Sequence, residues 1–233
     1  MRKDVIIACD FAGKKELLEF LGLFPEEKPY VKIGMELFYA EGPEIVREVR
    51  RRGHRIFLDL KLHDIPNTVK KAMKVLSALD IDMVNVHAGG TMAMMQAALE
   101  GLTRPDGTRP LLIAVTQLTS TNQERMQEEL WIPKPIDEVV MHYARNAQKA
   151  GLDGVVCSPQ EAERVHSVCG TEFLTVTPGI RFEGGEAGDQ ARIMTPKQAA
   201  RNGSDYIVVG RPITEAADPL EAYRKCCLEF LGE

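Results

Sequence analysis

The chain has 233 residues, 44% of them hydrophobic, and a net charge of −5. This length suits one large α/β domain or two small ones, and because we find no linker we expect one domain over residues 1–233. Basic and acidic residues are mixed, which excludes a broad basic face for nucleic acid, and no apolar run approaches the roughly 20 residues of a membrane span. Since Asp10 interrupts the only apolar run near the start, we expect no signal peptide and a cytoplasmic protein.

Short β-type apolar runs recur along the chain, and the spacing leaves room for a helix between each pair. The predicted strands are 5–9, 30–34, 55–61, 83–87, 111–118, 154–157, 173–177 and 206–210. The predicted helices are 14–23, 43–52, 66–79, 91–102, 136–150, 159–168, 195–202 and 213–231. Eight alternating strand and helix units predict a closed (β/α)8 TIM barrel, which typically has about 250 residues. An open doubly wound sheet is the alternative, but no strand is followed by G-x-G-x-x-G, and the long last helix could seal a barrel.

One segment, residues 120–135, falls outside this alternation. It contains T-N-Q-E at 121–124, which is typical of a helix start, and then Trp131 and two prolines. We expect an extra helix over the fifth loop, and a packing role is as good an interpretation of this segment as a functional one.

The most informative stretch is F-L-D-L-K-L-H-D-I-P-N-T at residues 57–68. Because side chains alternate along a strand, Asp59 and Lys61 should leave the strand on the same face. Asp64 falls where a loop opens a helix at about residue 65, and Thr68 lies on the same side of that helix start. A surface ion pair would explain an arbitrary D-x-K. Charges that end so apolar a strand are partly buried, however, and cost several kcal/mol unless they are paired, so we interpret the cluster as functional.

Polar residues also close the other predicted strands. Catalytic residues of barrels lie at the C-terminal ends of the strands, so these positions are diagnostic. Each has an ordinary alternative: Asp10 could cap the first helix, Lys32 could reach solvent, and His87 could be a buried core imidazole. Their convergence on one rim favours a site. The residues are Asp10, Lys32, Asn85, His87, Thr116, Gln117 and Thr119.

The seventh and eighth loops carry P-G-I-R at 178–181 and G-R at 210–211. These two loops hold a phosphate in many barrels. Gly210 would let the backbone approach an anion, and Arg211 could bind it with two hydrogen bonds. Between the loops, the glycine-rich stretch 181–192 suits a mobile flap, with Gln190 at its far hinge.

Several motifs together resemble orotidine 5′-phosphate decarboxylases of the short bacterial type. They are D-x-K-L-x-D-I-P-N-T at 59–68, V-K-I-G at 31–34, L-T-S-T at 118–121, T-P-G-I-R at 177–181, D-Q at 189–190 and V-V-G-R at 208–211. The match runs from Asp10 to Arg211, and the first motif is specific to that superfamily. The resemblance implies a homodimer of (β/α)8 barrels that converts orotidine monophosphate to UMP and CO2 in pyrimidine biosynthesis, without metal or organic cofactor.

The resemblance also implies a role for each matching residue. Lys61 would donate the proton to pyrimidine C6, and Asp64 and Thr68 would reach across the dimer interface into the partner's site. The alternating charge array around the reacting carbon would consist of Lys32, Asp59, Lys61 and Asp64, with Asp59 counted among the substrate-binding residues as well. The remaining substrate-binding residues would be Asp10, Lys32 and Thr68 for the ribose, Thr119 for the pyrimidine, and Arg181, Gln190, Gly210 and Arg211 for the phosphate end and flap closure.

The chemistry fits such an array. Loss of CO2 from C6 leaves a carbanion without a good electron sink, so the site must stabilise negative charge and deliver a proton, and a lysine ammonium does both. The first alternative is a sugar-phosphate enzyme of the same superfamily, a ketogulonate phosphate decarboxylase or hexulose phosphate synthase. These share D-x-K-x-x-D but bind magnesium and typically carry glutamate where this chain has Lys32, whose ammonium opposes a divalent cation. The second is a non-catalytic phosphate-binding barrel, which a replaced Lys61 would have suggested.

Overall fold

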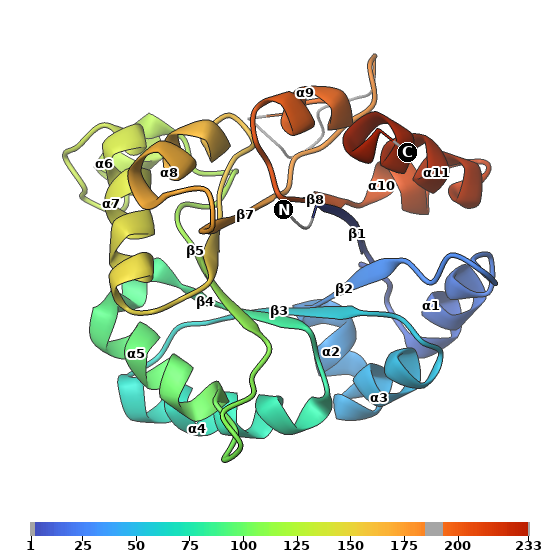
Figure 1. The fold of residues 1–233 in the computed structure, drawn as a ribbon, viewed down its shortest axis with the longest axis horizontal. Coiled ribbons are helices and arrows are strands. Elements are labelled where there is room, and N and C mark those ends of the chain that lie inside the picture. The colour runs from blue at the N-terminus through green and yellow to red at the C-terminus, as the bar shows by residue number, and fades with distance from the viewer. Residues whose placement is uncertain (1–2, 185–192, 233) are drawn as a thin grey trace.

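The computed structural model describes residues 3–184 and 193–232, which form one closed barrel of parallel strands. The strands follow one another in chain order, and β1 pairs with β8 to close the ring (Figure 1). The strands are β1 (Asp4–Ala8), β2 (Tyr30–Gly34), β3 (Ile56–Leu62), β4 (Met83–His87), β5 (Leu111–Val115), β6 (Gly154–Val156), β7 (Leu174–Thr177) and β8 (Tyr206–Val209). The predicted TIM barrel is confirmed, and the open sheet is wrong.

The helices lie outside the ring of strands (Figure 1). They are α1 (Lys14–Leu21), α2 (Met35–Glu41), α3 (Pro43–Arg51), α4 (Pro66–Leu76), α5 (Thr91–Leu102), α6 (Gln123–Glu128), α7 (Ile136–Lys149), α8 (Ala162–Cys169), α9 (Pro196–Arg201), α10 (Arg211–Thr214) and α11 (Pro219–Leu231), with 3-10 turns η1 (Ser77–Leu79) and η2 (Ala88–Gly90). The extra helix expected after the fifth strand is α6, and the Asn122 side chain caps it by accepting a hydrogen bond from the backbone N–H of Arg125.

Two predictions about the helices are wrong. The sequence pattern did not predict α2, which is separated from α3 only by Gly42, a residue with φ of 67° that a side chain would disfavour. The single helix expected over 213–231 is two helices. A new helix starts at Pro219, because the Asp218 side chain accepts a hydrogen bond from the backbone N–H of Glu221 and the proline occupies the first helical position.

The core has two layers, because the strands are buried on both faces. A large cluster fills the space between strands and helices, and a smaller cluster fills the interior of the barrel. On three neighbouring strands, the interior row runs from an apolar residue to a polar one two positions later: Tyr30 to Lys32, Phe57 to Asp59, and Met83 to Asn85. The apolar interior therefore ends in a layer of charged and polar side chains at the C-terminal mouth.

Within the described ranges 3–184 and 193–232, we find no helix long and apolar enough to cross a membrane.

Candidate active site

Four charged side chains form a continuous chain across the mouth of the barrel. The Lys32 ammonium lies 2.8 Å from Asp10 Oδ1 and 3.5 Å from Asp59 Oδ2, and the Lys61 ammonium donates to Asp59 Oδ1 at 2.7 Å. The signs therefore alternate along the order Asp10, Lys32, Asp59 and Lys61. The Asp59 side chain is only 9% exposed and the Lys32 side chain 11%, so the centre of the array is largely desolvated and its two charges depend on their neighbours, whereas Asp10 is 60% exposed and Lys61 25%.

The array keeps its two central groups charged. Burial alone would raise the pKa of the Asp59 carboxyl, but Lys32, Lys61 and the hydrogen bonds from Lys61 and Asn85 outweigh it and hold the pKa below its ordinary value. Burial likewise would lower the pKa of Lys32, but the charges of Asp59 and Asp10 outweigh it and raise the pKa. A buried carboxylate and a buried ammonium therefore coexist at neutral pH.

The backbone around Lys61 departs from a regular strand. The pairing of β3 with β4 shifts register between Leu58 and Leu62, which marks a bulge in β3. Within the bulge, the backbone of Lys61 has φ of 49°, in the left-handed region that residues with a side chain seldom adopt. Such strained backbone clusters at functional sites, where the surroundings hold it in place. The bulge lies directly at the residue that the sequence marks as the proton donor.

The glycine of the V-K-I-G motif has a steric role at this site. A Cβ atom added at Gly34 would lie 3.1 Å from Asp10 Oδ1 and 3.2 Å from the Lys32 ammonium, closer than ordinary contacts. Gly34 therefore leaves room for the ion pair between Asp10 and Lys32. The alternative role of Asp10 as a helix cap is wrong, since the residue preceding α1 is Gly13 and the side chain that accepts a hydrogen bond from the first helical residue, Lys14, is that of Glu41.

Two adjoining cavities lie at the mouth. One of about 240 Å3 is lined by Lys32, Asp59, Lys61 and Thr119 together with apolar residues such as Phe57 and Val115. The second, of about 410 Å3, shares Lys32 with the first and also has Asp10 in its wall. The charge array thus lies where the two cavities meet, which suits a ligand with a flat apolar part at one end and a polar part at the other.

The second cavity contains the residues predicted to bind a phosphate. Arg181, Gly210 and Arg211 line it with Pro178 and Gly179. Among residues 3–184 and 193–232, a Cβ at Gly210 would meet only Ala8, at an ordinary contact distance of 3.6 Å, so these residues leave space beside this backbone. Gln190 and most of the predicted flap at 181–192 lie outside the described residues.

Asp64 and Thr68 do not join the array in this chain. Both are exposed and line a third cavity, of about 330 Å3, on the outer side of Lys61. Asp64 Oδ1 accepts a hydrogen bond from the backbone N–H of Ile65 at 2.6 Å, and α4 begins at Pro66, as the sequence predicts. Lys61 lines both this cavity and the inner one, so it lies between the array and Asp64.

His87 and Asn85 have different positions relative to the array. His87 is partly buried at the end of β4, with its ring centroid 5.5 Å from that of His63, and burial, followed by the charges of His63 and Lys61, lowers its pKa. Asn85 is fully buried and bonds both Asp59 and Lys61. The sequence identified Asn85 only as a polar strand residue, and its one distinguishing signal was an amide in the apolar run M-V-N-V-H.

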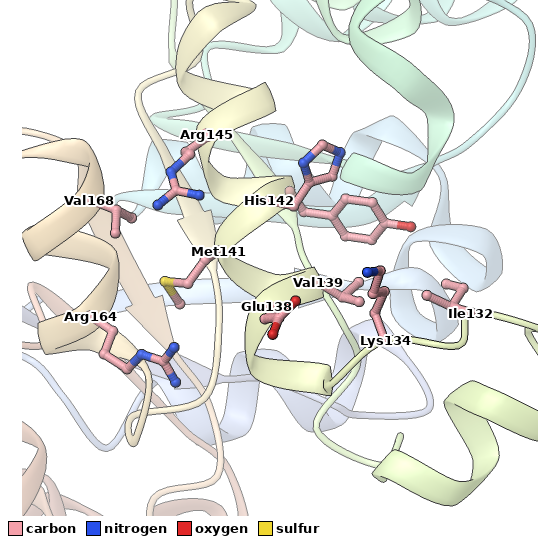
Figure 2. A pocket seen from close by; sticks show the side chains of 10 residues that line it. Ile132, Lys134, Glu138, Val139, Met141, His142, Arg145, Arg164 and Val168 are labelled. Carbon is pink, nitrogen blue, oxygen red and sulfur yellow. The ribbon is translucent and has the colours of Figure 1, made fainter.

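A cavity of about 790 Å3, larger than these three, lies elsewhere, between α7, α8 and the loop that carries Ile132 and Lys134. Figure 2 shows Arg145 and Arg164 on neighbouring helices on one side of it. Arg164 forms an ion pair with Asp137, and no residue of the charge array reaches this cavity. Trp131, beside it in sequence, is 88% exposed, whereas Met126 of the same segment is fully buried, so the segment 120–135 packs through α6 and not through Trp131.

Within residues 3–184 and 193–232, no group of three or more His, Cys, Asp and Glu side chains is arranged to hold a metal ion.

Comparisons with known proteins agree on one family. The profile of the "Orotidine 5′-phosphate decarboxylase / HUMPS family" matches residues 3–226. An orotidine 5′-phosphate decarboxylase of Bacillus cytotoxicus is 57% identical over 235 residues, covering 100% of this chain and 99% of the relative. A crystal structure of orotidine 5′-phosphate decarboxylase from Lactobacillus acidophilus superposes with a TM-score of 0.87 at 41% identity, covering 98% of this chain and 99% of that one. A crystal structure of a conserved protein from Geobacillus kaustophilus has the same TM-score of 0.87, at 50% identity.

Proposed function

The chain belongs to the orotidine 5′-phosphate decarboxylase family and has the carboxy-lyase activity of that family in pyrimidine biosynthesis, and we propose that the charge array performs this reaction with Lys61 as the proton donor. The observation that carries the proposal is the position of the Lys61 ammonium, 2.7 Å from a buried Asp59 and on the wall of the cavity that Thr119 also lines. An ammonium here lies beside the carbon at which negative charge develops.

The reaction requires one bond to break and one proton to move. The bond between pyrimidine C6 and the carboxylate breaks, CO2 leaves without the bonding electrons, and the pair stays on C6. Lys61 stabilises this charge and then transfers a proton to C6 to give UMP, after which solvent returns the proton to the lysine amine. Because the Lys61 ammonium lies beside the buried Asp59 on the wall of the inner cavity, its attraction to the developing carbanion acts in a lower dielectric than that of water and is stronger there.

Asp59 and Lys32 prepare this step. Asp59 Oδ1 accepts from the Lys61 ammonium and Oδ2 faces Lys32, so the carboxylate holds Lys61 in one orientation. Lys32 and Asp10 lie where the two cavities meet, and we assign them to the ribose hydroxyls, with Thr119 at the pyrimidine. Arg181, Gly210 and Arg211 take the phosphate. Gln190 is assigned with them on the resemblance alone. Binding energy from the phosphate can then be used to position C6 against Lys61, which raises turnover as well as affinity.

We also assign the chain to a homodimer with shared sites. The cavity around Asp64 and Thr68 is lined by two large apolar side chains that are unusually exposed, Met35 at 44% and Tyr39 at 70%, and Ile65, which follows Asp64 in the chain, is 67% exposed. Exposed apolar residues grouped around polar ones are typical of a protein interface. In a dimer built on this surface, Asp64 of each chain would complete the neighbouring subunit's array on the outer side of Lys61, and Thr68 would reach the ribose in the same site.

We place the protein in the cytoplasm. Its cysteines, Cys9, Cys157, Cys169, Cys226 and Cys227, are free thiols, which suits a reducing compartment.

The magnesium-dependent sugar-phosphate reaction is the alternative within the superfamily. Lys32 argues against it, because a buried ammonium between Asp10 and Asp59 competes with a divalent cation for the same two carboxylates. The test follows the loss of orotidine monophosphate absorbance with the enzyme in excess EDTA, beside Lys61→Ala as a control. We expect full turnover in EDTA and almost none in the variant. Turnover that chelator abolishes and magnesium restores would refute the assignment.

A further inference from the structure

Asn85 lies at the point where β4 meets the bulge of β3. Leu58 pairs with Val84 and Leu62 pairs with Val86, so the stretch from Asp59 to Lys61 lies opposite Asn85 alone. Asn85 is fully buried, and its side chain extends to this stretch from the neighbouring strand. Ladder hydrogen bonds cannot hold a bulge of this kind, because β4 offers too few backbone groups opposite it.

The Asn85 amide makes one bond to each of the two residues that flank the bulge. Its oxygen accepts from the backbone N–H of Lys61 at 2.8 Å, and its nitrogen donates to Asp59 Oδ1 at 2.7 Å. A backbone N–H can only donate and a carboxylate can only accept, so the site requires one acceptor and one donor on a single short side chain. An ionised aspartate lacks the donor, and leucine lacks both groups.

These two bonds control the geometry of the array. The first fixes the N–H of a residue held at φ of 49°, from which the Lys61 side chain departs. The second directs Asp59 Oδ1 toward β4 and the Lys61 ammonium, which leaves Oδ2 facing Lys32 at 3.5 Å. Rotation of the carboxylate would break this division, in which each oxygen faces one lysine.

We propose that Asn85 is a positioning residue for the decarboxylation, which fixes the carboxylate of Asp59 and the backbone of Lys61 so that the ammonium is directed at C6. This rests on the proposed function, since it concerns the same site. Asn85 acts through its two neighbours, and its removal changes the rate of the chemical step more than the binding of substrate. A misplacement of about 1 Å at a reacting group can cost about a hundredfold in rate.

The surroundings of Asp59 give a second readout, in the pH dependence. Among the described residues, the charged and titratable groups around it are Lys32 on β2, Lys61 on β3, His87 on β4, and Asp10 beyond Lys32. The hydrogen bond that the Asn85 amide donates favours the ionised form of Asp59. Loss of this hydrogen bond should raise the pKa of the Asp59 carboxyl and move the acid limb of the pH profile of kcat to higher pH. A purely structural role would leave this limb in place.

The experiment compares Asn85→Leu and Asn85→Asp with the wild type and Lys61→Ala. The matched control is Thr175→Val. Thr175 lies in β7, outside the array, and its side chain is also fully buried. The substitution removes the hydrogen bond that Thr175 Oγ1 donates to Asp205. We expect Asn85→Leu to lower kcat by about a hundredfold with KM changed by less than about threefold. Asn85→Asp, which has the same shape but places a second carboxylate beside Asp59, should move the acid limb further upward. Thr175→Val should lower the melting temperature and leave kcat and the acid limb unchanged.

The outcomes separate the two proposals. A wild type that does not decarboxylate orotidine monophosphate would refute the proposed function. The positioning role alone would be refuted if the wild type is active, Lys61→Ala is inactive, and the folded Asn85 variants keep the wild-type kcat and acid limb. If neither Asn85→Leu nor Asn85→Asp folds, Asn85→Ser is measured in the same way. Failure of all three to fold would also overturn the proposal, because Asn85 would then serve the fold and not the reaction.

Discussion

Mixing two inactive variants tests whether the active site is shared between chains. Lys61 belongs to the inner array, with its ammonium 2.7 Å from Asp59, whereas Asp64 is exposed on the outer cavity and contacts its own following residue. If Asp64 completes the partner's site, Lys61→Ala on one chain and Asp64→Ala on the other fall in the same site of a mixed dimer. One site then carries both substitutions and the other carries neither.

The expected recovery follows from counting. Removal of a group that stabilises transition-state charge costs about 10²–10³ in kcat, so each variant alone should be nearly inactive. Free exchange of equal amounts yields mixed dimers as about half of the total, each with one intact site of two, so activity should return to about a quarter of wild type per site. Measurable activity therefore rises about 25-fold over either variant alone if each substitution costs about 10² in kcat, and about 250-fold if it costs about 10³.

The assay follows orotidine monophosphate absorbance after the purified variants are mixed and subunit exchange is confirmed by native mass spectrometry. The matched control mixes Lys61→Ala with a chain that carries both substitutions, since no site in that mixed dimer is intact. Exchange without recovery in the first mixture would place Asp64 in its own chain's site and refute the two-chain active site.

Three further predictions concern single residues. Lys61→Ala should abolish nearly all turnover, whereas the dissociation constant for UMP, measured by calorimetry, should change little, because the lysine acts on charge that appears only in the transition state. A residual rate within about tenfold of wild type would exclude Lys61 as the acid. Lys32→Met removes the charge that most strongly favours ionised Asp59, so the pKa of the Asp59 carboxyl should rise. As the pH is lowered, kcat of the variant should therefore fall at a higher pH than kcat of the wild type, in which Asp59 stays ionised below the ordinary aspartate pKa. Acid limbs that coincide in the two proteins would contradict this coupling. Arg211→Ala should lower kcat/KM for orotidine monophosphate by about 10- to 150-fold, as expected for the loss of a hydrogen bond of about 1.5–3 kcal/mol to a charged group. The rate with orotidine, which lacks the phosphate, should be unchanged. An equal loss with both substrates would argue against a phosphate contact.

The barrel could be predicted because its signal is local. Each strand is buried on both faces and bounded by turn residues, so eight apolar runs and their spacing already define the architecture. The polar residues that end these runs were predicted to meet, and Asp10, Lys32, Asp59 and Lys61 do form one array. The break before Pro219 was missed because the apolar period continues across it, although Asp218 is a standard cap.

The pair Asp59 and Lys61 shows where sequence reasoning succeeds for an incomplete reason. Strand alternation predicts that the two side chains lie on one face, and they do meet. The strand is nevertheless bulged between Leu58 and Leu62, and the left-handed backbone at Lys61 helps set where its ammonium lies. No local pattern predicts this conformation, in which the backbone N–H of Lys61 donates to Asn85, because Asn85 lies 24 residues further along the chain and beside the bulge only once β3 and β4 have paired. The reactive geometry is therefore a property of the tertiary structure, even though both charged residues belong to one short motif.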